Sequence, residues 1–127
     1  MLDLRSGQRR LLARVRDSGE AAVTVGPYVF DPAAVEGGNT AIVRAIREGL
    51  NVIVIDEIGP LEFRGLGWAP GLRAALDECA ETQELIVVVR PSLIDELPGQ
   101  FPSPSWDGAT TISPPWPDIH GPKSGAR

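Results

Sequence analysis

The sequence predicts an α/β fold with a mainly parallel sheet and an N-terminal β-hairpin. Two apolar runs, VIVI at 52–55 and LIVVV at 85–89, lack the polar alternation of a strand with one wet face. Such runs are typical of strands buried inside parallel sheets. Between them, residues 72–79 carry apolar side chains at helical spacing. A strand, a helix and a second strand form a βαβ unit with a right-handed crossover.

Short β segments are expected before this unit. Residues 1–16 suit a hairpin, because Ser6-Gly7 separates two weakly apolar stretches and is a typical turn pair. A polar turn is expected at 17–20, and short strands at 22–25 and 28–30.

Helix signals follow these segments. Asp31 is a good N-cap, and Pro32 suits the first helical position because the missing N–H has no helical partner there. The pair Gly37-Gly38 predicts an interruption, after which a second helix runs to a stop at Gly49.

The C-terminal part is expected to be mostly irregular. One or two helical turns at 92–97 and a last short strand at 109–112 are expected. Residues 98–127 hold seven of the twelve prolines and few aliphatic side chains, which predicts little regular structure. The chain therefore divides into an α/β domain at 1–113 and a Pro/Gly-rich tail at 114–127.

Composition limits the classes of function. A chain of 127 residues with 43% apolar and 23% charged residues is an ordinary soluble domain. Its net charge of -5 argues against nucleic acid and anionic membranes as partners. The single Cys79 cannot form an intramolecular disulfide and is expected to pack as a small hydrophobe. With no apolar leader, the cytoplasm is the expected compartment.

The end of the first apolar run carries the chemistry. Asp56 and Glu57 follow directly after VIVI, so they should lie at the carboxyl edge of the sheet, where open α/β proteins bind their ligands. In phosphoryl transfer, one acid typically holds Mg²⁺ while a second accepts a proton from the attacking water. Two solvated acids at a strand end remain the structural alternative.

The residues that follow add a resemblance. The stretch VIVIDEIGPLEFRGLGW at 52–68 resembles the small nucleoside-triphosphatase family of archaea, bacteria and vertebrates, in which a DEIG-x-x-E segment forms the Walker B region. The resemblance extends more loosely from SGQRRLLAR at 6–14 to IVVVR at 86–90. It implies a partial RecA-like P-loop NTPase fold and Mg²⁺-dependent hydrolysis of nucleoside triphosphates with little base preference.

The resemblance also implies roles for individual residues. Asp56 would hold the magnesium ion and Glu57 would activate water. Glu62 would be a supporting acid, with a plain surface carboxylate as the equal alternative. Gly59 and Arg90 are candidates for contact with the nucleotide, although Arg90 is equally suited to a salt bridge with one of the two acids.

Weaker candidates stand in the same loop and in the tail. Arg64 suits a solvated loop charge better than a phosphate contact, and Trp68 suits a hydrophobic anchor at a helix start better than a base stack. His120 has no second His or Cys nearby, so a metal site there has no support.

One half of a triphosphate site is missing from the sequence. A P-loop requires Gly-x-x-x-x-Gly-Lys-Ser/Thr between a strand and a helix, but the only lysine is Lys123, in the tail after Pro122. The chain resembles the later part of the family, which is compatible with a truncation, a second polypeptide or a true loss. We expect weak triphosphate binding and no hydrolysis by the chain alone. The alternative is a non-catalytic binding or assembly module, whereas a phosphoacceptor domain lacks its required acidic pair and lysine.

The missing segment has a structural consequence. In RecA-like folds the P-loop strand lies beside the strand that corresponds here to 85–89, so that strand should expose an unpaired edge. Self-association or a partner chain is expected at this edge, unless the predicted strand at 109–112 fills it.

Overall fold

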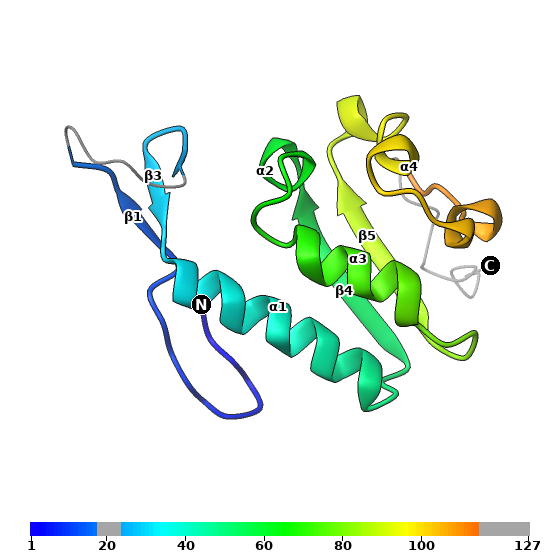
Figure 1. Ribbon diagram of the computed structural model, residues 1–127, viewed down its shortest axis with the longest axis horizontal. Coiled ribbons are helices and arrows are strands. Elements are labelled where there is room, and N and C mark those ends of the chain that lie inside the picture. Colours follow the sequence, from blue (N-terminus) through cyan, green and yellow to red (C-terminus); the bar gives the residue numbers. More distant parts are fainter. Residues whose placement is uncertain (18–23, 115–127) are drawn as a thin grey trace, which may run out of the picture.

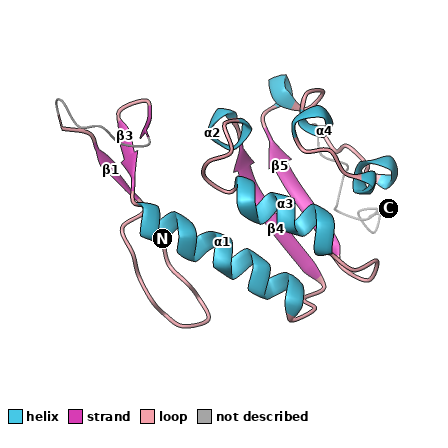
Figure 2. Cartoon of the chain, in the orientation of Figure 1, coloured by secondary structure: helices cyan, strands magenta, loops and turns pink. Residues whose placement is uncertain are grey.

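The computed structural model describes residues 1–17 and 24–114 and confirms the α/β class (Figure 1). Its elements form two separate sheets with helices between and in front of them (Figure 2). In chain order they are β1 (Ala13–Val15), β2 (Thr24–Val25), β3 (Tyr28–Phe30), α1 (Pro32–Arg47), β4 (Val52–Ile58), α2 (Pro60–Phe63), α3 (Ala69–Glu78), β5 (Glu84–Val89), η1 (Pro91–Leu93), α4 (Leu97–Gln100) and η2 (Pro104–Gly108).

The N-terminal region is antiparallel. An isolated bridge joins Leu2 to Arg9, and Gly7 adopts a φ of 71° in the turn between them, which confirms the predicted hairpin. Beyond it, three strands pair in the order β1-β3-β2. The predicted strand at 22–25 is confirmed at Thr24–Val25, while its first two residues and most of the turn at 17–20 lie outside the described part of the chain.

Helix α1 begins as predicted but is not interrupted. The Asp31 side chain accepts a hydrogen bond from Ala33 N at 2.9 Å. The predicted break at Gly37-Gly38 is wrong, because α1 is continuous to Arg47. Packing explains why position 38 is a glycine. The indole of Trp68, 30 positions later in the chain, fills the space that a Cβ on Gly38 would occupy. Tertiary packing therefore requires the glycine without breaking the helix. The helix ends beside Gly49, which has a φ of 72°.

The βαβ unit is confirmed. Strands β4 and β5 pair in parallel, with Ile53 beside Leu85 and Val54 beside Ile86. Helix α3 connects them and lies in front of both strands (Figure 1). Its Leu72, Ala75 and Leu76 form one buried core with Ile46 of α1 and with the inward-facing isoleucines of β4, which are Ile53, Ile55 and Ile58.

Burial on both faces of this sheet is not observed. Along β4, exposed and buried residues alternate from Val52 to Ile55, and along β5 exposed residues alternate with half-buried ones. The apolar runs were correctly predicted as parallel strands, but the prediction of two covered faces was wrong. Helices α1 and α3 supply a cover for one face only.

Residues 97–108 are more ordered than their proline content predicts. Phe101 is fully buried, and its ring meets that of Phe63 edge to face at 6.1 Å. The indole N–H of Trp106 donates to the Phe101 carbonyl at 2.7 Å. Hydroxyl groups of Ser103 and Ser105 donate to the Leu76 carbonyl at the end of α3, at 3.3 Å and 3.1 Å respectively. This segment therefore packs onto the core, whereas little regular structure was expected from residue 98 onward.

Of the other two C-terminal predictions, the helical turns are confirmed and the strand is wrong. The helical turns expected at 92–97 appear as η1 and the start of α4. The strand expected at 109–112 is wrong, since these residues pair with no strand and Ile112 is exposed. A strand needs a neighbouring strand to pair with, and residues 109–112 extend away from the folded core after η2. Lys123, His120 and the rest of 115–127 lie outside the described residues.

Cys79 behaves as expected at the end of α3. Its side chain is half-buried against the core, and burial raises the pKa of the thiol. Across residues 1–17 and 24–114, no helix has the length and hydropathy needed to span a bilayer.

Candidate functional site

The acidic pair lies on a β-bulge at the carboxyl end of β4. Ile55 pairs with Val87 and Ile58 pairs with Val89. Between these two pairs β4 advances by three residues and β5 by two. The extra residue changes the direction of the side chains at this point, a device that recurs beside active sites. Asp56 and Glu57 are both exposed here. The prediction that they lie at the carboxyl edge of the sheet is therefore met.

Glu57 has an unusual backbone conformation. With a φ of 62° it is the one non-glycine residue with positive φ in the described segments. Its N–H donates to Asp56 Oδ1 at 2.7 Å, which ties the two acids together. Left-handed backbone costs a residue with a Cβ roughly 1 to 2 kcal/mol, and such strain clusters at functional sites. Nothing in the sequence of a strand end signals this conformation.

Relief of this strain should be measurable. Replacing Glu57 by glycine is expected to raise the free energy of unfolding by about 1 kcal/mol, because glycine adopts positive φ without steric cost. Urea denaturation measures the change. The comparison is Asp56→Gly, one residue earlier and without positive φ, which also removes the acceptor of Glu57 N and is expected to lower stability by about 1–2 kcal/mol. Equal effects at the two positions would contradict the assignment of strain to Glu57.

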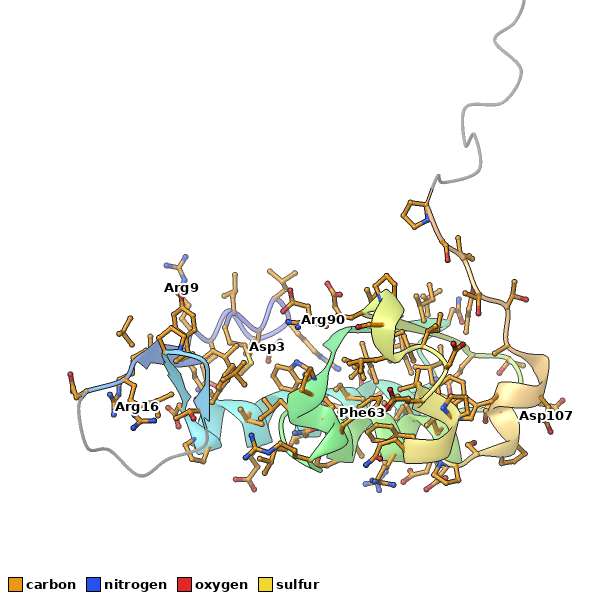
Figure 3. The ribbon with its side chains drawn as sticks, turned by 90° about the horizontal axis from the view of Figure 1, so that it is seen from above. Asp3, Arg9, Arg16, Phe63, Arg90 and Asp107 are labelled. Atoms are coloured by element: carbon orange, nitrogen blue, oxygen red, sulfur yellow. The ribbon has the colours of Figure 1, made fainter. Side chains whose placement is uncertain are left out.

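Arg90 reaches the same edge from β5. A Cβ built on Gly59 would lie 4.0 Å from Arg90 Nε, so the guanidinium passes close to the backbone just after the acidic pair. Figure 3 looks down on this edge of the sheet, with Arg90 labelled. Within the described part of the chain, Arg90 forms no ion pair. The alternative of a salt bridge to Asp56 or Glu57 is therefore not observed, and the guanidinium is available to an anion.

Glu62 is a buried clamp. Its side chain is only 4% exposed. One carboxylate oxygen accepts from Gly59 N at 3.0 Å, and the other accepts from Trp68 N at 3.1 Å. These two N–H groups mark the start and the end of the loop after the acidic pair. The surface-carboxylate alternative for Glu62 is wrong. The bond from Gly59 N is the Glu half of a capping box, and glycine has no side chain to supply the other half.

Asn39 extends the clamp to helix α1. Its amide donates to the carbonyl groups of Gly67 and Val35, at 2.8 Å and 3.1 Å, and its oxygen accepts from Gly71 N at 2.7 Å. A Cβ on Gly67 would overlap the Glu62 carboxylate. The loop from 59 to 68 is thus held by polar groups from two directions. From the sequence, Asn39 or Thr40 was predicted only as the N-cap of a second helix. The contacts of Asn39 with Gly67 and Gly71 were missed, because these residues lie 28 and 32 positions further along the chain.

Trp68 and Arg64 are the remaining candidates in the loop. Trp68 packs against the core and over Gly38, as expected for an anchor at the start of α3. Arg64 is exposed at the end of α2.

The acidic pair offers only part of a metal site. In the described residues, no group of three or more His, Cys, Asp or Glu side chains could hold a metal ion. Magnesium sites in nucleotide enzymes, however, commonly use one or two carboxylates together with substrate phosphates and water. Two exposed carboxylates at one edge therefore fit Mg²⁺ only when a phosphate supplies the remaining ligands.

Comparisons with known proteins identify the family and relatives of this chain. A family model described as NTPase matches residues 1–99. The chain is similar to the nucleoside-triphosphatase THEP1 of Methanopyrus kandleri, with 33% identity over 88 residues that cover 69% of this chain and 46% of that protein. It is also similar to the nucleoside-triphosphatase THEP1 of Thermofilum pendens, with 41% identity over 76 residues, 59% of this chain and 40% of that protein.

These matches are partial. The chain spans less than half the length of each of these two relatives. No solved structure gave a significant match.

Proposed function

Because this chain belongs to the NTPase family, we propose that its acidic sheet edge is one half of a site for Mg²⁺-dependent hydrolysis of nucleoside triphosphates. The mixed α/β architecture is consistent with a partial P-loop NTPase fold. The observation that carries the proposal is the convergence of Asp56, Glu57 and Arg90 at one edge of a parallel sheet, where Arg90 has no ion-pair partner among residues 1–17 and 24–114.

Each residue has a chemical role in the proposed reaction. Glu57 accepts a proton from the water that attacks the terminal phosphorus. Arg90 offsets negative charge on the phosphoryl oxygens as the bond to the leaving diphosphate breaks. Asp56 holds Mg²⁺, which when bound neutralises phosphate charge. Gly59 is buried, and its N–H already donates to Glu62, so its proposed role is to hold the loop beside Arg90 and not to contact a phosphate.

Glu62 supports this site without touching the substrate. Both of its carboxylate oxygens already accept backbone hydrogen bonds, and the group is buried. Its proposed role is to hold Gly59 and Trp68, and through them the loop that follows Glu57. The earlier assignment of Glu62 as a supporting acid becomes a positioning role.

The proposed site still needs a phosphate cradle. Arg90 is the cation proposed for the β and γ oxygens, and no Gly-x-x-x-x-Gly-Lys-Ser/Thr occurs in the sequence. We therefore expect the chain to be inactive alone and to act with a P-loop from another segment or polypeptide. The competing proposal is a non-catalytic binding or assembly module, which the exposed apolar face of the β4–β5 sheet favours.

Phosphate release from ATP and GTP tests these proposals. The 127-residue chain alone should show no Mg²⁺-dependent release above a buffer blank. Release should appear when the portion of the Methanopyrus kandleri relative outside its matched region is fused ahead of Met1. In that fusion, Glu57→Gln should lower kcat by about 10²-fold to 10⁴-fold, whereas the exposed control Glu81→Gln should leave kcat unchanged.

Three outcomes would count against parts of the proposal. Turnover by the chain alone, abolished by Glu57→Gln, would show that no second segment is needed. Fusion activity that survives Glu57→Gln would remove the catalytic role of the acidic pair. A fusion that binds no triphosphate and shows no release would favour the assembly module.

A further inference from the structure

Asn39 is an unfavourable residue at its position in the chain. It stands in the interior of α1, although asparagine favours caps and turns, where its amide can bond the backbone. Helix α3 lies beside α1 (Figure 1) and has a similar exception, since Gly71 stands in its first turn. A Cβ on Gly71 would lie 2.8 Å from the Asn39 oxygen, so the glycine lets the amide approach. Residues that contradict local preference in this way are expected at functional or strained sites.

The amide of Asn39 is fully engaged. Its NH₂ group donates to the Val35 and Gly67 carbonyls, and its oxygen accepts from Gly71 N. The side chain is half-buried. A polar side chain whose donors are all used in a partly buried place holds one orientation. Asn39 therefore fixes Gly67, near the end of the loop, relative to α1.

The Glu62 carboxylate holds the same part of the loop. It accepts from Trp68 N, the residue after Gly67, and a Cβ on Gly67 would overlap it. Its second oxygen accepts from Gly59 N. Gly59 follows Glu57 by two residues. Hydrogen bonds and single peptide links therefore connect helix α1 to the backbone that leaves Glu57.

We propose that Asn39 is a positioning residue for the acidic pair and that it acts through Glu62. By holding Gly67, it keeps the Glu62 carboxylate against Gly59 N and fixes the direction in which the chain leaves Glu57. In the described part of the chain its own hydrogen bonds go to α1, the loop and α3, so Asn39 is not a catalytic residue. The effect on hydrolysis rests on the proposed function, whereas the link from Asn39 to Gly59 does not.

Hydrogen exchange of the full chain tests this link. In Asn39→Ala, the Gly71 amide loses its acceptor and should exchange faster whatever the role of Asn39. The Gly59 amide bonds Glu62 and not Asn39. It should nevertheless exchange about tenfold faster, because the Glu62 carboxylate loses its fixed position. Rates are compared with those of the slowest amides in β4 and β5, which removes the contribution of global unfolding.

The matched control is Gln83→Ala. Gln83 also forms three side-chain hydrogen bonds, but at the amino end of the sheet: it donates to two carbonyl groups, at 3.2 Å and 2.9 Å, and accepts from Ala80 N at 3.0 Å. Its loss should lower the urea midpoint about as much as Asn39→Ala does. The relative exchange rate of the Gly59 amide should stay at the parent value.

Glu57 itself gives a spectroscopic signature. Its φ of 62° brings the amide and Hα protons close together, so the parent chain should show a strong NOE between them. Asn39→Ala should weaken this NOE, and Gln83→Ala should not. Asn39→Asp provides a second variant, since it keeps an acceptor for Gly71 N but loses both donated bonds. It should reproduce the Gly59 and Glu57 changes while the Gly71 amide stays protected.

The fusion with the Methanopyrus kandleri portion supplies the catalytic measurement. Asn39→Ala and Asn39→Asp should each lower kcat for ATP by about tenfold to 10²-fold, because a small misplacement of the base is costly. KM should change by less than about twofold, since contacts with the nucleotide are left in place. Gln83→Ala should leave both kcat and KM at the parent values.

Three results would overturn the proposal. Unchanged relative exchange at Gly59 in both Asn39 variants would confine the role of Asn39 to its direct partners. Equal acceleration at Gly59 in Gln83→Ala would show a general loss of stability. A kcat at the parent value, with or without a raised KM, would remove Asn39 from the positioning of the base. A parent fusion without hydrolysis would count against the proposed function alone, because exchange and the NOE still decide the link from Asn39 to Gly59.

Discussion

Replacing Glu62 by alanine is expected to lower the free energy of unfolding by about 3 kcal/mol. The substitution leaves Gly59 N and Trp68 N without their acceptor in a buried part of the molecule. Each unsatisfied buried N–H costs roughly 1–3 kcal/mol. Glu62→Gln should lose about 2 kcal/mol, because an amide offers one acceptor oxygen and turns its NH₂ group toward the second N–H. Urea denaturation measures both changes.

The control for Glu62 is Glu81→Ala, an exposed acid in the turn before β5, which should stay within about 0.5 kcal/mol of the parent chain. Hydrogen exchange gives a local check, since the amides of Gly59 and Trp68 should exchange faster in Glu62→Ala than in the parent. If Glu62→Ala were as stable as Glu81→Ala, the clamp would have no energetic role, and the loop after Glu57 would need another explanation for its order.

Two neighbouring glycines in α1 are expected to respond with opposite signs. Gly38→Ala should lower the free energy of unfolding by about 2 kcal/mol, because its Cβ overlaps the Trp68 ring and the indole has to move. Gly37→Ala should raise it by about 0.5–1 kcal/mol, since the nearest atom to a new Cβ is a Met1 methyl at 3.9 Å and alanine favours the helix. Thermal and urea denaturation measure both.

A double substitution tests the cause of the Gly38 effect. If the loss comes from the Trp68 ring, Gly38→Ala should cost little in a Trp68→Leu background, where the overlapping ring atoms are absent. The same cost in both backgrounds would place the strain within the helix backbone instead.

Local signals explain why much of the fold was predictable. Asp31-Pro32 and Gly49 mark the ends of α1 through cap chemistry that involves only nearby backbone groups. The two apolar runs and the helical spacing between them are also short-range patterns, and they predicted the βαβ unit. The position of Asp56 and Glu57 followed directly, because parallel strands end at one edge.

Long-range contacts account for the errors. The continuity of α1 depends on Trp68, and the order of 97–108 depends on burial of Phe101 against α3. The conformation of Glu57 depends on the register between β4 and β5. The residues in each of these contacts lie far apart in the chain. Local propensity and proline content therefore could not predict the contacts.

By itself the sequence determined the family, the parallel strand pair and the acids at its edge, because these depend on residue identity and short-range periodicity. The tertiary structure alone decided that Glu62 is a clamp rather than a free acid, since its donors come from both ends of a loop. It also decided that the sheet is covered on one face only. Solvent exposure is a property of what packs above a residue, and the same apolar run is compatible with a covered or a bare face.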